Sequence, residues 1–394
     1  MRRLRIAQVA PPLERVPPPA YGGTERIVHE LVTELVRRGH DVTTYATADS
    51  DVPGRLIPIA DQPLRRFGHG WEAGGFFVGV VANVLDDADR YDLIHSHLEW
   101  FNPILAKTAR VPVVGTFHGR LDFPWMAGVL GERRLHRVAI SENQARIHSN
   151  LAWTVIHNGL SLDGAPFGQE RTDDLCFVGR VAPEKGIVEA MDVARRTGRR
   201  LRIAAKIGTT VAERGYYEEV FKPALERSGS LIEFLGEIAG PERDRLISSS
   251  YATLMPGQWP EPFGLVAIES LACGTPVIAR RIGALPEIIR HGRDGFFGDD
   301  AQQLAYYVDK VATLDRAAIR ASVLERFSAT RMADDYEELY ERILTGRSET
   351  GLGAITSPAD DVGRAVGPGR PTWASGSVSG GTSRSSEETG TPSR

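Results

Sequence analysis

Two glutamates stand in the segment PEPFGLVAIESLACGTP, residues 260–276. Glu261 lies between two prolines, where the chain is expected to be extended or turned, whereas Glu269 lies inside an apolar helical run that begins after Gly264. The first turn of such a helix has free N–H groups and the positive end of the helix dipole, which together suit an anion. A carboxylate at Glu269 can accept hydrogen bonds from a pair of vicinal hydroxyls, such as those of a ribose. We therefore interpret the segment as a ligand site rather than as two solvent-exposed helix charges.

A second group of residues carries positive charge. Arg180 and Lys185 belong to GRVAPEKG, which follows a strand-like run and opens the next helix. An arginine offers a planar fork and a lysine a point charge, and the two together suit a diphosphate. The alternative is a salt-bridged surface loop. Lys206 ends the strand-like run IAAKIG and is expected to contact a phosphate or a base.

The first third of the chain has weaker signals. Gly22 and Gly23 lie before a helical run in AYGGT, where they would let a ligand approach the backbone, yet the pattern is not the G-x-G-x-x-G of a dinucleotide site. His118 ends the run GTFHG and is expected to face a cleft, whereas His95 and His97 are interpreted as structural. An H-E-x-x-H pattern is absent, and we predict no metal site.

Short β-rich runs alternate with helical patterns, which is typical of a doubly wound parallel α/β sheet. The runs fall into two series, with a loop-like linker near 160–172 between them. The expected strands are residues 5–10, 41–46, 92–97, 111–117, 137–140 and 154–159 in the first series, and 175–181, 200–208, 231–238, 252–257 and 275–281 in the second. The sequence thus predicts two similar domains with a ligand cleft at the carboxyl ends of their strands.

Composition limits the partners and the location. The chain has 394 residues and a formal net charge of -4, so no nucleic-acid partner is predicted. Two cysteines, Cys176 and Cys273, are too few for a disulfide framework and are expected to be buried, which fits a reducing cytoplasm. No apolar run is long enough for a signal peptide or a membrane span, and the Gly-, Ser- and Thr-rich residues 346–394 are predicted to be a disordered tail.

The motifs EPFGLVAIES, GRVAPEKG, YGGTER, GTFHG, VIHNG and RIGALPEIIRHGRDG together resemble the retaining glycosyltransferase family 4, also called group 1, which has the GT-B fold. The resemblance covers roughly residues 4–345. It implies two Rossmann-like domains that face a cleft. They are an acceptor domain at 1–165, which the last helix at 330–345 rejoins, and a donor domain at 166–329.

The resemblance also implies roles for the candidate residues. Arg180 and Lys185 would hold the diphosphate of a nucleotide-sugar co-substrate, with no metal or other cofactor. Glu269 would bind the nucleotide ribose and Glu261 the donor sugar, while the N–H groups of Phe263, Gly264 and Leu265 would meet sugar and phosphate. Gly22 and Gly23 would lie at the donor, with Gly23 letting the first loop close on the phosphate, and His118 would lie near the transferred sugar. Lys206 stands where the family often has a glycine-rich turn, which puts its contact with base or phosphate in question.

The function expected from the resemblance is transfer of a sugar, UDP- or GDP-linked, to a glycan, lipid or small molecule with retention of configuration. Two alternatives stay open: a nucleotide-sugar 2-epimerase of the same fold and a non-catalytic protein that binds nucleotide sugars. Because family members often dock on bilayers, peripheral contact with the inner face of the membrane is also expected. The missing dinucleotide fingerprint argues against a dehydrogenase.

Overall fold

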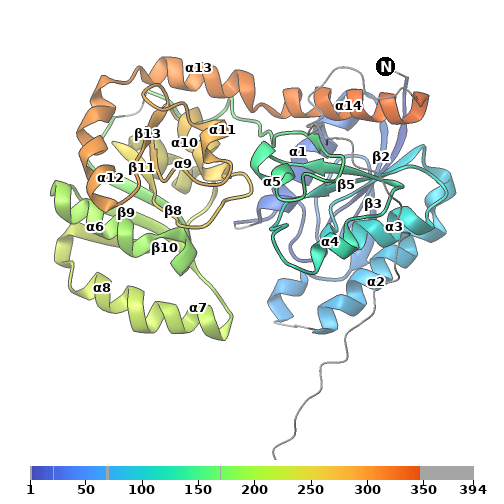
Figure 1. Ribbon diagram of the computed structural model, residues 1–394, viewed down its shortest axis with the longest axis horizontal. Coiled ribbons are helices and arrows are strands. Elements are labelled where there is room, and N and C mark those ends of the chain that lie inside the picture. The colour runs from blue at the N-terminus through green and yellow to red at the C-terminus, as the bar shows by residue number, and fades with distance from the viewer. Residues whose placement is uncertain (1, 21, 68–70, 169, 347–394) are drawn as a thin grey trace, which may run out of the picture. The chain divides into compact units, whose positions relative to one another are not determined.

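The computed structural model describes residues 2–346 except 21, 68–70 and 169, and Figure 1 shows how the elements of this part are arranged. The predicted disordered tail therefore lies, apart from its first residue, outside the described residues. The described strands form two parallel sheets, and each sheet has helices on both faces. This arrangement confirms the predicted fold class.

The first sheet has seven strands in the described part of the chain, in the order β3-β2-β1-β4-β5-β6-β7, and every neighbouring pair is parallel. Its strands are β1 (Arg5–Val9), β2 (Asp41–Thr47), β3 (Arg55–Ala60), β4 (Leu93–Ser96), β5 (Val113–Phe117), β6 (Leu135–Ala139) and β7 (Thr154–Val155). Its helices are α1 (Gly23–Arg37), α2 (Trp71–Asp86), α3 (Asn102–Thr108), α4 (Met126–Val129) and α5 (Glu142–Arg146).

The second sheet has six strands among the described residues, in the order β10-β9-β8-β11-β12-β13, again all parallel. The strands are β8 (Leu175–Val181), β9 (Leu201–Ile207), β10 (Ile232–Gly236), β11 (Ala252–Met255), β12 (Val277–Ala279) and β13 (Gly295–Phe297). The helices are α6 (Ile187–Thr197), α7 (Val211–Tyr216), α8 (Lys222–Glu226), α9 (Gly240–Ser249), α10 (Leu265–Ala272), α11 (Leu285–Ile288), α12 (Ala301–Val308), α13 (Arg316–Arg326) and α14 (Ala329–Thr345).

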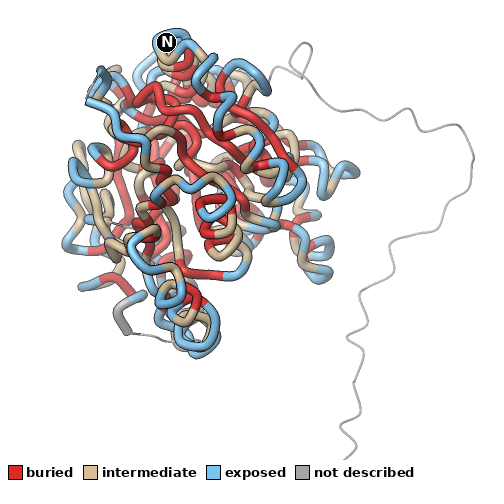
Figure 2. The backbone as a smooth tube through the Cα atoms, turned by 90° about the vertical axis from the view of Figure 1, so that its left-hand side faces the viewer, coloured by how far each residue is buried: buried red, intermediate tan, exposed pale blue. Residues whose placement is uncertain are grey.

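The inner strands of each sheet are largely buried on both faces, whereas the edge strands β3 and β10 are only partly buried, and the buried segments occupy the interior in Figure 2. Alternate side chains of β1 show this division. Ile6 packs in the core that also contains α1 and α14, whereas Ala7 and Val9 pack in the core beneath α2 and α3. Each sheet can therefore hold its carboxyl edge rigidly, and that edge is where the candidate residues lie.

The chain passes between the two sheets twice, and the two passes lie side by side. Leu160 N donates to Phe327 O at 3.0 Å, and Ala329 N donates to Leu160 O at 2.9 Å. Gly159 packs so closely against Ser328 that a Cβ there would stand 2.2 Å from its carbonyl oxygen. The first pass thus falls near the predicted linker, although the domain limits at 165/166 and 329/330 stay predictions.

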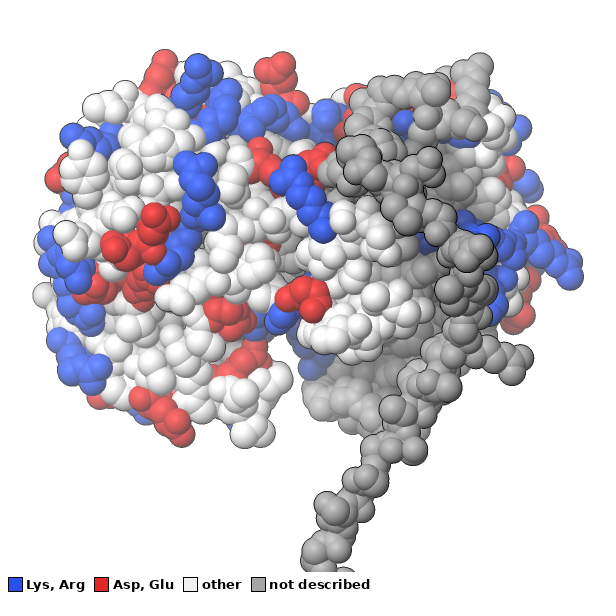
Figure 3. Space-filling model, in the orientation of Figure 1, with Lys and Arg blue, Asp and Glu red and all other residues white. Residues whose placement is uncertain are grey.

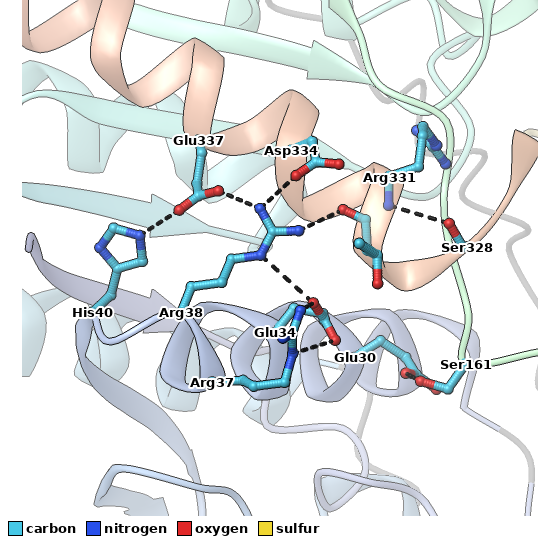
Figure 4. Close-up of polar contacts among 11 residues, drawn as sticks. Glu30, Glu34, Arg37, Arg38, His40, Ser161, Ser328, Arg331, Asp334 and Glu337 are labelled. Carbon is cyan, nitrogen blue, oxygen red and sulfur yellow. Dashed lines mark hydrogen bonds and ion pairs between the residues drawn. The ribbon is translucent and has the colours of Figure 1, made fainter. Parts of the chain in front are cut away.

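Helix α14 returns to the first sheet and packs beside α1 (Figure 1). Figure 4 shows the polar contacts that anchor it there. Arg38, directly after α1, donates to Asp334 at 2.6 Å and to the Thr330 carbonyl at 2.8 Å, and it also contacts Glu337. His40 Nε2 lies 2.7 Å from the other oxygen of Glu337. The expected last helix is thereby attached to the first half of the chain.

Candidate active site

The larger of the two described cavities measures about 550 Å³ and is lined by residues of both halves. From the first half it receives Gly23, Glu25, His97, Glu99, Trp100 and His118. From the second half it receives Arg180, Lys185, Trp259, Glu261, Phe263, Gly264 and Leu265. The structure therefore brings together eight of the residues that the sequence singled out, namely Gly23, His118, Arg180, Lys185, Glu261, Phe263, Gly264 and Leu265.

Lys185 and Glu261 meet in this cavity as an ion pair. Lys185 ends the short 3-10 turn that follows β8, and Glu261 lies in the loop before α10. Gly186 has a φ of 68° at this point, and a Cβ on it would stand 2.7 Å from the Pro256 carbonyl oxygen. Only glycine allows this close approach of the two loops in such a backbone conformation, and it positions the lysine beside the carboxylate.

Arg180 occupies the carboxyl end of β8, where it stands in register with Lys206 on β9. Its guanidinium contacts Glu213 and Glu184, the latter at 2.7 Å. Its positive charge is thus held in place by two carboxylates at the edge of the cavity. An anionic ligand could bind here by taking over these ion pairs, because arginine presents its donors as a planar fork.

A smaller cavity of about 130 Å³ adjoins the first and shares with it Gly23, Val178, Gly179, Leu265 and Val266. Three of the residues that the sequence singled out line only this one: Gly22, Lys206 and Glu269. Lys206 Nζ lies 3.6 Å from Glu237. The structure therefore separates Glu261 from Glu269, each at its own cavity.

Glu269 is only 6% exposed and is held by two arginines. It contacts Arg26 of α1, and Arg243 Nη2 lies 3.1 Å from its Oε1 atom. Sequence reasoning missed both arginines. Arg26 belongs to the quoted YGGTER motif, but its partner is 243 positions away in the chain, so no local pattern indicates the contact.

The amino end of α10 lies where the two cavities meet. Gly264 caps this helix with a φ of 110°, and a Cβ there would stand 2.9 Å from Leu285 Cδ2. Gly23, at the start of α1, approaches the same helix, since a Cβ on it would stand 3.4 Å from Leu265 Cδ1. Gly22 instead packs in its own loop, where a Cβ would stand 2.7 Å from Pro18. The first α10 turn and the first-half loop thus face one another, and a phosphate site at this place stays a prediction.

His95, His97 and His118 form one hydrogen-bonded chain through Gln8. His118 Nε2 lies 2.9 Å from His97 Nδ1, and His97 Nε2 donates to Gln8 Oε1 at 3.0 Å. Since His97 donates through Nε2, its Nδ1 accepts from His118, which leaves Nδ1 of His118 as an acceptor. His95 is fully buried and bonds Tyr340 and Thr116 at 2.7 Å each, in accord with a structural role.

Burial keeps these rings neutral. It lowers the pKa of His118 to about 3, although the residue retains some accessible surface toward the cavity, and it lowers the pKa of His97 and of His95 well below the usual range. A neutral His118 offers a hydrogen-bond acceptor but no positive charge at neutral pH.

Glu99 is a residue that sequence reasoning missed. It follows β4 with a φ of 52°, and its Oε1 accepts from the N–H groups of His118 and Gly119 at 2.8 and 3.0 Å. Its Oε2 is buried without a hydrogen-bond partner in the described part of the protein. Burial raises the pKa of Glu99 to about 7, although the two N–H donors act in the opposite direction. The only local signal for it is a carboxylate just beyond the carboxyl end of a strand.

Direct contacts between the two halves flank the cavities. Ser141 Oγ donates to the Pro262 carbonyl at 2.7 Å, next to Glu261. Glu287 accepts from the N–H groups of Glu142 and Asn143 at 2.8 Å each, and His157 Nε2 lies 2.8 Å from it. These contacts connect α5 to α11 and hold the halves together beside the site.

The surface of the described residues carries charges of both signs. On the face shown in Figure 3, basic and acidic side chains are interspersed among uncharged ones. Among the residues that the structure describes, no cluster of histidine, cysteine, aspartate or glutamate side chains could hold a metal ion. Both cysteines are buried, as predicted. Within the same ranges, every helix is too short or too polar to cross a membrane.

Comparison with known families shows what class of protein has this fold and site. The family model of the group 1 glycosyl transferases matches residues 166–322, and that of glycosyltransferase family 4 matches residues 21–163. The chain belongs to this family of glycosyltransferases, which makes it an enzyme of the transferase class.

Relatives of assigned activity differ in their acceptors. The glycogen synthase of Mycobacterium tuberculosis is 29% identical, with 86% of this chain and 92% of that protein covered. The D-inositol 3-phosphate glycosyltransferase of Thermobispora bispora is 30% identical, with 75% and 78% covered.

Solved structures share the fold over nearly their whole length. AviGT4, a glycosyltransferase of avilamycin A biosynthesis, has a TM-score of 0.66 at 25% identity, with 87% of this chain and 98% of that one covered. Anabaena HepE, solved with UDP-glucose, has a TM-score of 0.67 at 20% identity, with 86% and 100% covered. The GT-B fold expected from the motifs is confirmed.

Proposed function

We propose that the protein transfers a glycosyl group from a nucleoside-diphosphate sugar, UDP- or GDP-linked, to a hydroxyl of a glycan, lipid or small molecule. Transfer would retain the anomeric configuration and require no metal or other cofactor. The observation that carries the proposal is the pair of adjoining cavities, one with Lys185 and Glu261 and the other with Lys206 and Glu269. Such a pair matches a ligand with a sugar at one end, a nucleoside at the other and a diphosphate between them.

Each group has a role in this reaction. Arg180 and Lys185 bind the diphosphate and stabilise the negative charge that develops on it as the bond to the sugar breaks. The N–H groups of Phe263, Gly264 and Leu265 bind sugar and phosphate at the α10 terminus. Lys206 contacts phosphate or base beside the ribose on Glu269, and Gly23 brings the first-half loop to the phosphate.

Two further groups hold the transferred sugar. Glu261 accepts hydrogen bonds from its hydroxyls, and neutral His118 accepts another through Nδ1. The acceptor oxygen attacks the anomeric carbon from the face that the phosphate leaves, and its proton passes to the departing phosphate oxygen. No protein nucleophile is required, and Glu261, which is paired with Lys185 in the free protein, acts as a hydroxyl ligand.

The relatives support the proposal at a coarser level. HepE was solved with UDP-glucose, and the named relatives act on glucan or inositol phosphate acceptors, which supports a nucleotide-sugar donor and a hydroxyl-bearing acceptor. Peripheral contact with a membrane stays a prediction.

The test begins with thermal shifts in the presence of UDP-, GDP- and ADP-sugars, because a ligand of the native state raises its melting temperature. The donor that binds is then incubated with acceptors in EDTA, nucleoside diphosphate release is measured, and the product linkage is determined by NMR. Transfer in EDTA with the donor's anomeric configuration is expected. An inverted product contradicts retention, loss of turnover in EDTA contradicts metal independence, a free epimerised sugar indicates the 2-epimerase, and binding without turnover indicates a non-catalytic protein.

A further inference from the structure

Four aromatic side chains and one arginine form a connected row, and both ends of this row line the larger cavity. Trp100 and Trp259 line that cavity. The Arg120 guanidinium lies 4.9 Å from the ring centroids of both Trp259 and Phe123. Phe123 stacks on Trp125 at 5.7 Å and 11°, and Trp125 meets Trp100 edge to face at 5.6 Å. We call these five residues the aromatic row.

Two side chains of the aromatic row are exposed to solvent, and one of its hydrogen-bond donors has no partner among the described residues. Trp100 is 45% exposed and Trp125 50% exposed, so two of the largest apolar side chains are left half in solvent. Contiguous exposure of this kind marks an interaction surface. The Nε1 donor of Trp259 is buried and has no partner among the described residues. A ligand that fits the row therefore needs both apolar faces and hydrogen-bonding groups.

The Trp100 end of the aromatic row lies beside the residues that we propose hold the transferred sugar. Trp100 directly follows Glu99, whose Oε1 is bonded to the His118 N–H at 2.8 Å and whose Oε2 has no partner among the described residues. His118 and Glu261 line the same cavity. A molecule lying on the row therefore ends at the place where an acceptor hydroxyl is needed.

We propose that the aromatic row binds the sugar rings of a glycan acceptor, with the terminal ring entering the cavity so that its hydroxyls meet Glu99. The proposal rests on the proposed glycosyl transfer and names its acceptor class. A pyranose ring has an apolar face of C–H groups and a rim of hydroxyls. The flat tryptophan faces match the former, while Arg120, the Trp259 N–H and the Glu99 carboxylate match the latter.

A lipid acceptor at this surface is less well matched. Arg120 is held by Asp122 through two hydrogen bonds of 2.7 and 2.6 Å, so its charge is balanced by a carboxylate that an anionic bilayer repels. The planar rings and balanced charge of the row favour a glycan.

The first measurement is direct binding, which does not depend on catalysis. Maltotetraose, cellotetraose and mannotetraose are titrated against the full chain, and affinity is read by calorimetry. The wild-type protein is expected to bind at least one of them, and Trp100→Ala and Trp125→Ala are each expected to weaken that binding about tenfold. Tyr306→Ala is the matched control, because Tyr306 is an exposed aromatic residue on α12, outside both cavities. Trp100→Phe keeps a flat ring and should retain most of the affinity.

The second measurement is transfer. With the nucleotide sugar that binds, both tryptophan variants should raise the glycan KM about tenfold and leave the donor KM unchanged. Failure of all three glycans to bind, or equal binding by the variants, overturns the proposal, as does tryptophan-dependent binding to phosphatidylcholine or phosphatidylglycerol vesicles in place of glycans. Glycan binding that needs the tryptophans without any donor turnover instead supports the row and overturns the proposed transfer, so the two failures are distinguishable.

Discussion

The two walls of the larger cavity hold their polar groups in opposite ways. In the first-half wall, His97, His118 and Glu99 have neutral hydrogen-bond partners, and burial keeps the two histidines neutral and raises the pKa of Glu99 to about 7. Arg65 of the same wall is paired with Glu14 at 2.7 Å. The second-half wall presents Lys185 and Glu261 as an ion pair. Neutral groups that are held in place suit hydrogen bonds to the hydroxyls of an uncharged ligand. A charged pair suits an ionic ligand, whose own charge can take the place of one member of the pair. This difference would let one cleft bind the proposed dianionic donor and an uncharged acceptor.

The largest effect is expected from removing the lysine of the charged wall. Lys185→Ala should lower kcat by a factor of about 10²–10³, because the loss of one preorganised hydrogen-bond donor to a developing negative charge has an effect of this size. Steady-state kinetics with saturating donor and acceptor would measure it. Lys222→Ala, which removes an exposed lysine paired with Glu218 at 2.9 Å, is the control and should leave kcat unchanged. A wild-type kcat in Lys185→Ala would show that the ion-paired second-half wall takes no part in the reaction.

Glu269→Ala should act on donor affinity rather than on rate. The loss of a charged hydrogen-bond acceptor for the ribose costs about 2 kcal/mol, which raises the donor KM about thirtyfold. The variant leaves Arg26 and Arg243 without this partner, so its melting temperature is measured alongside the kinetics. Glu233→Ala breaks contacts to Arg200 and Arg202 on the same sheet and serves as the control. An unchanged donor KM would assign Glu269 to folding alone.

The neutral wall can be tested through the pH dependence of stability. The pKa of Glu99 is raised from 4.5 to about 7, so between these values the folded state holds a proton that the unfolded state has lost. Wild-type stability from this group is therefore present below pH 4.5 and is lost as the pH rises through 7. Glu99→Gln lacks this loss, and its stability relative to the wild type should rise by on the order of 1–2 kcal/mol over the range.

Denaturant unfolding at pH 4.5, 6 and 7.5 measures the difference. The buried histidines titrate with the opposite sign, since their lowered pKa values cost stability as the pH falls below 6.5, but they are present in both proteins and cancel. Glu219→Gln, at an exposed helix position, is the control. A pH-independent difference for Glu99→Gln would mean that Glu99 is ionised in the folded protein throughout the range.

The smallest expected effect is that of salt, which should change binding at the ion-paired second-half wall but not at the first-half wall. Raising KCl from about 50 to about 500 mM shortens the screening length and should raise the donor KM roughly threefold, while the acceptor KM stays constant. Equal salt dependence of both constants would show that the acceptor also binds through charge.

Much of the fold could be read from local pattern. Strand β8 has the bounds that its apolar run predicts, and the helical run expected beside Gly22 and Gly23 is observed as α1, Gly23–Arg37. Two edge strands were missed. Strand β3 contains Pro58, which argues against a strand but is tolerated at a sheet edge, and β13 is a three-residue strand in a glycine-rich, charged stretch. In both cases neighbouring strands, rather than local propensity, decide the structure.

The sequence by itself determined the second-half wall of the larger cavity, which we propose binds the donor. A strand, a short loop and a helix start bring Arg180, Lys185, Glu261 and Gly264 to the carboxyl edge of one sheet, because parallel βα units all turn the same way. The division of Glu261 and Glu269 between sugar and ribose stays a prediction, which their separate cavities support.

Only the tertiary structure decided the first-half wall, which we propose binds the acceptor. Glu99 has its left-handed backbone and its bonds to the His118 and Gly119 N–H groups because β4 and β5 are neighbours in the sheet. The neutral state of His118 and the raised pKa of Glu99 come from burial by residues that are distant in the chain. Contacts between distant residues and loss of solvent are properties of the packed chain, and no short stretch of sequence encodes them.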